Sequence, residues 1–129
     1  MTTGFVYVIE SPTPFDLLNG QTAAQLLCEE LEVAGIGHGY HVAADKEMLE
    51  IVLRLRIATE CKRRAIPATL VLSMYAESCG LRLTSGELVS WDELQGMLLA
   101  VRYAQPIGAL VCFVHGRGGE LTDGFVPGW

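Results

Sequence analysis

The stretch Ala68-Thr-Leu-Val-Leu-Ser73 decides the fold of this 129-residue chain, because it is a run of apolar and β-branched residues that begins directly after Pro67. Such runs are typical of strands that are buried on both faces, as in parallel sheets. Two further runs have the same character, Phe5-Val-Tyr-Val-Ile9 and Ala109-Leu-Val-Cys-Phe-Val114. The sequence therefore predicts a sheet whose main strands are parallel.

Segments with helical periodicity separate these strands. One helix is expected from Gln21 to Ala34, where apolar residues recur on one stripe. Asp45 can cap a second helix, whose expected inward positions are Leu49, Val52, Leu53, Ile57 and Cys61. Ser90 and Glu93 have the spacing of a capping box that opens a third helix. Each predicted helix is long enough to connect two parallel strands.

Two shorter elements complete the predicted fold. Tyr40 to Ala43 is expected to form a short strand, and Leu81 to Val89 a small β-hairpin around Ser85-Gly86. Alternating strands and helices predict an α/β fold, namely a three-layer sandwich with a mostly parallel sheet of about four strands plus the hairpin. We expect one domain over residues 1–129, with an irregular glycine-rich tail at 116–129.

Composition excludes several classes of protein. Half of the residues are hydrophobic and the mean hydropathy is +0.33, so the chain can bury a core and is not intrinsically disordered. A net charge of −6 argues against nucleic acid or an anionic membrane as the main partner, since both attract clustered Lys and Arg. The four cysteines are scattered, which favours a reducing compartment. With no apolar run of membrane-spanning length and no signal-peptide pattern, we expect a cytoplasmic protein.

Ligands of open α/β sheets bind beyond the carboxyl ends of the strands. Three segments are expected there: Glu10 to Phe15, Tyr75 to Gly80, and His115 to Gly119. The candidate cleft residues in them are Glu10, Ser11, Thr13, Tyr75, Glu77, His115 and Arg117.

Known ligand motifs are absent from these segments. A dinucleotide fold needs Gly-x-Gly-x-x-Gly after its first strand, where this chain has Glu10-Ser-Pro-Thr-Pro14. Ser11 and Thr13 leave a flavodoxin-like ligand-binding domain open as a weaker alternative, although the intervening prolines remove backbone donors. His38 and His41 have no Cys or carboxylate at a fixed metal-ligand spacing, so we expect no metal and no cofactor.

The order of several short features points to one family. They are Leu18-Asn-Gly20, Gly35, Asp45, Leu70-Val-Leu-Ser-Met74, the hairpin turn Ser85-Gly-Glu87 and Ser90-Trp-Asp-Glu-Leu94. This order resembles the caspase-like proteins of bacteria, the metacaspase and caspase-like peptidase group. The resemblance implies a sheet of flavodoxin-like topology, a His-Gly after the third strand and a catalytic Cys after the fourth.

The chain departs from that pattern at both catalytic positions. Tyr75-Ala76 stands where the family has His-Gly, and His115-Gly116 follows the fourth strand, with Cys112 inside the strand. The resemblance therefore implies a degenerate, non-catalytic member that serves as an interaction, scaffold or sensor domain in a bacterial signalling system.

A rearranged catalytic pair is the alternative. Cys79 and His115 are predicted on neighbouring loops, and Glu77 is available to orient the imidazole, so a small cysteine hydrolase is chemically reasonable. The competing interpretation is that Cys79 packs in a turn and His115 ends a strand.

We also expect assembly with a protein partner or as a homodimer. If no further strand follows, the segment Ala109 to Val114 forms a sheet edge that is apolar and carries no protective Lys or Pro. That edge, or the tail from Gly124 to Trp129, is the expected two-fold interface.

Overall fold

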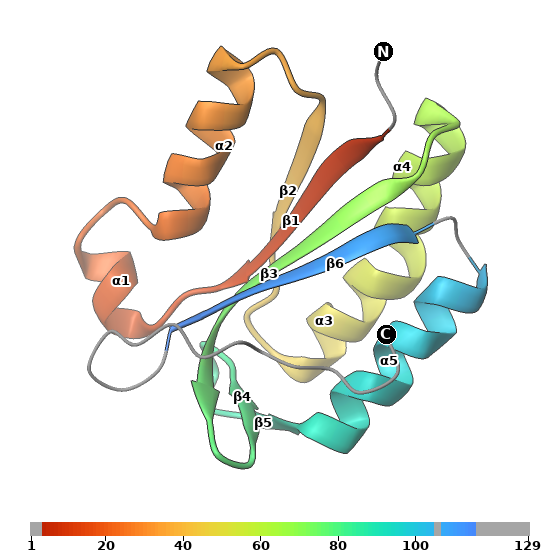
Figure 1. The fold of residues 1–129 in the computed structure, drawn as a ribbon. Helices are drawn as coiled ribbons and strands as arrows, with labels where there is room; N and C mark the ends of the chain where they lie inside the picture. Colours follow the sequence, from red (N-terminus) through yellow and green to blue (C-terminus); the bar gives the residue numbers. More distant parts are fainter. Residues whose placement is uncertain (1–3, 105–106, 116–129) are drawn as a thin grey trace.

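A computed structural model of the chain describes residues 4–104 and 107–115, and side chains up to Tyr103. Six strands form one mixed sheet within these residues (Figure 1). In chain order the elements are β1 (Phe5–Ser11), α1 (Pro14–Leu18), α2 (Ala23–Val33), β2 (His38–Val42), α3 (Lys46–Ile51), the π-helical η1 (Val52–Arg56), α4 (Ile57–Arg64), β3 (Ala68–Glu77), β4 (Gly80–Arg82), β5 (Leu88–Ser90), α5 (Trp91–Ala104) and β6 (Ile107–His115).

The sheet is organised around β3. Strand β1 runs parallel to β2 and β3, and β6 runs parallel to β3, whereas β4 pairs antiparallel with β3 and β5 antiparallel with β4. Tyr75 is paired with Arg82 of β4 and with His115 of β6, so these two strands flank β3 from opposite sides. The predicted α/β class is confirmed. The hairpin was expected beside the sheet as a separate element. It is part of the sheet, because β4 pairs with β3.

Strand β3 is longer than the sequence indicated. It continues past Ser73 to Glu77 because Tyr75, Ala76 and Glu77 pair with β4. The prediction that Tyr75 and Glu77 lie in a loop after the strand is therefore wrong. Glu10, Ser11 and His115 likewise belong to strands, not to the loops beyond them.

Local signals placed two of the helix starts correctly. The Asp45 carboxylate accepts the Met48 N–H at 2.7 Å, and Ser90 forms the expected capping box with Glu93. Helix α2 begins at Ala23, two residues after the expected Gln21, behind a Thr22–Gln25 capping box that was not predicted.

Helix α1 was not predicted. Thr13 caps it and Pro14 occupies its first turn, a position that proline favours because its nitrogen needs no partner there. The sequence interpretation treated the prolines only as strand breakers.

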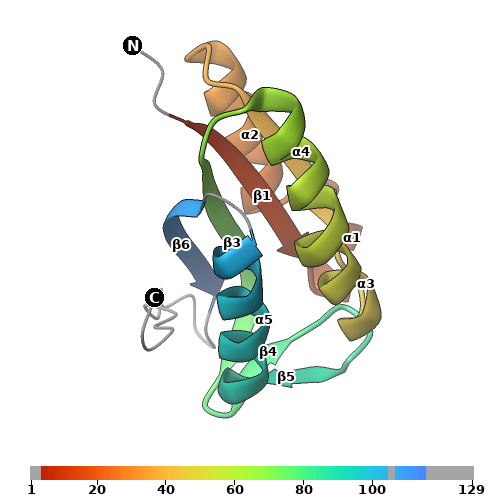
Figure 2. The ribbon, with the colours of Figure 1, turned by 90° about the vertical axis from the view of Figure 1, so that its right-hand side faces the viewer.

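Helices cover both faces of the sheet. Helices α1 and α2 lie on one side and α3, α4 and α5 on the other, as the two views show (Figures 1 and 2). The five predicted inward residues of the second helix are all buried in the larger core, on the α3–α5 side, although the π segment η1 interrupts that helix. The smaller core lies under α2 and contains Val8, Ala24, Leu31 and Val71.

None of the helices in the described residues is both long enough and apolar enough to cross a membrane.

Candidate functional site

The carboxyl ends of β3 and β6 lie side by side. Tyr75 and His115 are paired in the register of the two strands, and Met74 pairs with Ser11 on the other side of β3. The topology thus brings three of the predicted cleft positions, Ser11, Tyr75 and His115, to one end of the sheet. The side chain of His115 and all of Arg117 lie outside the described residues.

The hydroxyl groups after β1 are used inside the fold. The buried Ser11 Oγ accepts the Thr84 N–H at 2.9 Å, and the Thr84 hydroxyl donates to the Pro12 carbonyl. The Thr13 hydroxyl accepts the Asp16 N–H at 3.1 Å as the cap of α1. These contacts hold the β4–β5 hairpin against the end of β1. The sequence predicted that Ser11 and Thr13 lie near this end of the sheet but did not indicate that role.

Glu10 lies beneath α2. The residue is 3% exposed, and its carboxylate accepts a hydrogen bond from the Tyr40 hydroxyl. Burial, reinforced by that hydrogen bond and by the charge of Glu10, raises the pKa of Tyr40. Burial also raises the pKa of the Cys28 thiol, with a further contribution from Glu10. The result is a protonated phenol held against a buried carboxylate, which joins β1 to β2.

Glu77 is held by an arginine. Its Oε2 accepts hydrogen bonds from Nε and Nη2 of Arg82 at 2.9 and 2.6 Å, and Arg82 also donates to the Gly86 carbonyl at 2.8 Å. Glu77, which was predicted to orient an imidazole, therefore links β3 to β4 of the hairpin through Arg82.

Cys79 is exposed in the turn between β3 and β4. The turn is fastened to the start of α5, because the Trp91 indole donates to the Ser78 carbonyl at 3.0 Å and the Trp91 N–H to the Cys79 carbonyl at 3.4 Å. The predicted Cys79–His115 pair stays a hypothesis, since only one of its two side chains is described.

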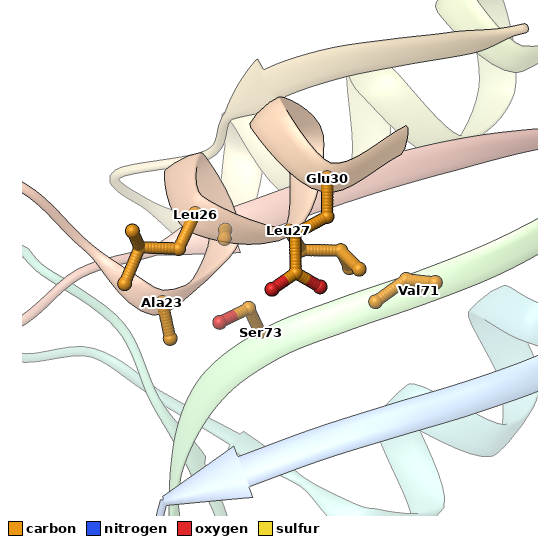
Figure 3. Close-up of a pocket in the computed structure, with 7 residues that line it drawn as sticks. Ala23, Leu26, Leu27, Glu30, Val71 and Ser73 are labelled. Carbon is orange, nitrogen blue, oxygen red and sulfur yellow. The ribbon is translucent and has the colours of Figure 1, made fainter. Parts of the chain in front are cut away.

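A pocket on the α2 side of the sheet was missed by the sequence interpretation. It has a volume of about 220 Å³ and is lined by Ala23, Ala24, Leu26, Leu27, Glu30, Val71 and Ser73. Figure 3 shows that the Glu30 side chain extends from α2 toward Ser73 of β3. The wall is apolar, so the pocket suits an aliphatic group and has one carboxylate to meet a cation.

The spacing of residues 23, 26, 27 and 30 places them on one side of a helix, which was the available signal. The pocket was overlooked because the apolar stripe of this helix, which includes Ala23, Ala24 and Leu27, was interpreted as wholly buried.

Within residues 4–103, no group of three His, Cys, Asp or Glu side chains is placed to hold a metal ion.

Comparison with models of known protein families and with curated protein sequences found no match.

Proposed function

We propose that this chain is a caspase-like domain that lacks a catalytic dyad and acts as an interaction, scaffold or sensor module in a cytoplasmic signalling system of bacteria. The observation that carries the proposal is the pairing of Tyr75 with His115. It brings together the ends of the two neighbouring parallel strands after which the resemblance requires His and Cys.

The strand arrangement supports the same assignment. Parallel strands run in the order β2, β1, β3, β6, and the β4–β5 hairpin lies between β3 and α5 in the chain. This is the sequence of elements that the resemblance implies, with flavodoxin-like topology in the parallel part of the sheet.

Peptide hydrolysis through a thiolate needs a cysteine and a base within hydrogen-bond reach. At the position of the histidine the chain has Tyr75, whose phenol is a much weaker base at neutral pH than an imidazole. Glu77 is engaged by Arg82, and the Cys79 turn is fastened to α5 through Trp91. These contacts favour a structural role for the residues that a rearranged dyad would use.

Peptidase assays with a panel of fluorogenic peptides that have basic or acidic residues before the scissile bond test this proposal. We expect no turnover by the wild-type protein and an alkylation rate of Cys79 equal to that of an exposed peptide thiol. The Cys79→Ser variant is the control. Turnover that disappears in this variant, together with fast alkylation of the wild type, would replace the proposal with the cysteine hydrolase that uses Cys79 and His115. A coloured purified protein would instead favour the flavodoxin-like ligand-binding domain.

A further inference from the structure

Helix α2 presents an incomplete apolar face to solvent beside the pocket. Ala23, Leu26, Leu27 and Glu30 line the pocket, and Val33 lies three residues farther along the helix on the same side. Leu26 is 49% exposed and Val33 is 90% exposed. Exposed leucine and valine side chains in a row beside a hollow mark a surface that another molecule can cover.

The charged residues of α2 all have one sign. None of the nine Lys and Arg residues precedes Lys46, whereas α2 alone carries Glu29, Glu30 and Glu32. In the described part of the chain Glu30 forms no ion pair. The pocket therefore favours an aliphatic side chain that has a basic neighbour.

The opposite side of the molecule carries a group of that kind. Leu55 in η1 is 53% exposed and stands between Arg54 and Arg56. Burial raises the pKa of the Tyr7 hydroxyl, and Arg56 lies close enough to that hydroxyl to act against the rise. Arg54 forms no ion pair with any of the residues whose side chains are described. Leu55 and Arg54 belong to η1, which lies between α3 and α4 in the chain. Figure 1 shows α3 and α4 on the side of the sheet opposite α2.

We propose that the pocket between α2 and β3 receives Leu55 of a second copy of this chain, with Glu30 of the first copy facing Arg54 of the second. The size fits, because the pocket measures about 220 Å³ and an apolar cavity of about 150 Å³ already accommodates benzene, which is larger than a leucine side chain. The opposite charges guide the approach and oppose the reverse pairing of two acidic faces.

The contact joins two different surfaces, so it is heterologous. Each copy has one pocket and one Leu55 on opposite sides of its sheet, and association leaves both ends available to further copies. The protein therefore forms head-to-tail oligomers and not a closed two-fold dimer. The proposal rests on this surface alone and does not depend on the caspase-like assignment.

Two variants that each remove one half of the contact test the proposal by complementation. Leu26→Glu blocks the pocket and leaves Leu55 intact, and Leu55→Glu does the reverse; both positions are exposed, so the fold tolerates the change. Sedimentation velocity from about 1 µM to about 500 µM should show concentration-dependent oligomers for the wild type and a 14.0 kDa monomer for each variant. An equimolar mixture of the two variants should form a dimer that does not grow, because only one compatible pair of surfaces remains. Leu18→Glu, at an exposed leucine outside the pocket, is the matched control and should behave as the wild type.

A charge swap tests the ion pair. Glu30→Arg should lower the association constant at least tenfold, and adding Arg54→Glu in the same chain should restore it, since every contact then has its charges exchanged.

Three results would overturn the proposal. If the wild type stays monomeric over the whole concentration range, the proposed contact does not form. Variants that associate as the wild type does would shift the interface elsewhere, for example to the β6 edge expected from the sequence. A mixture of the two variants that stays monomeric, as each variant does alone, would mean that both residues belong to one isologous surface.

Discussion

Replacing Tyr40 with phenylalanine should destabilise the protein through Glu10, a residue that the substitution leaves unchanged. The Tyr40 hydroxyl donates to the carboxylate of Glu10, a residue that is 3% exposed under α2. Phenylalanine keeps the ring and removes the donor, so the carboxylate stays buried without that partner. A buried polar group deprived of a hydrogen bond costs about 1–3 kcal/mol, and a charged one more. Because Tyr40 is only partly buried, water can reach one side of the pair, and we expect a loss of about 2 kcal/mol in the free energy of unfolding.

Urea denaturation followed by circular dichroism measures this loss. With a denaturant dependence of about 1–3 kcal/mol per molar urea for proteins of this size, the midpoint should fall by about 1 M. Tyr103→Phe is the matched control, since the same atom is removed from a side chain that is 88% exposed, and its midpoint should not move. The double variant Glu10→Met/Tyr40→Phe removes both polar groups and should recover most of the stability, because an apolar pair leaves no unpaired group.

The reasoning would be refuted if Tyr40→Phe shifted the midpoint no more than Tyr103→Phe does. It would also be refuted if the double variant lost the sum of the two single losses, since the two groups would then be energetically independent.

Two further predictions concern a glycine and the pH dependence of stability. Gly80→Ala should cost about 2–3 kcal/mol because the added Cβ would lie 2.0 Å from the Val89 carbonyl oxygen, whereas Gly96→Ala, in open space on α5, should stabilise by about 0.5–1 kcal/mol; equal midpoints in thermal unfolding would contradict this. The free energy of unfolding should also fall as pH rises above about 9, because four buried or partly buried groups have raised pKa values in the folded state and the unfolded chain releases their protons first. These groups are Cys28, Cys61, Tyr7 and Tyr40. Urea midpoints that stay constant between about pH 8 and about pH 11 would show that these groups titrate alike in both states.

Much of the local structure could be predicted from the sequence. The buried run at residues 68–73, the Asp45 cap and the Ser90–Glu93 capping box depend on backbone and side-chain preferences within a few residues, so the pattern alone indicates them. The turn at Ser85-Gly86 was identified for the same reason. Gly86 has a positive φ, which glycine adopts readily and residues with a Cβ do not.

The candidate site could be predicted only in part. The meeting of Tyr75 and His115 followed from the general rule that the carboxyl ends of parallel strands share one edge. The partners of the other cleft residues did not follow from any rule of sequence. Arg82 donates to Glu77, and the Thr84 N–H donates to Ser11. Both hydrogen bonds depend on where the hairpin packs against β3 and β1, which the hairpin's own residues do not specify.

The sequence by itself determined the α/β class, the order of the main elements and the inward positions of the second helix, because periodicity and capping act over one or two turns of chain. Only the tertiary structure decided the length of β3, the burial of Glu10 against Tyr40, and the pocket between α2 and β3. The physical reason is that each of these depends on segments far apart in the chain, such as residues 23–30 and 71–73, and on which edges and faces meet when the sheet assembles.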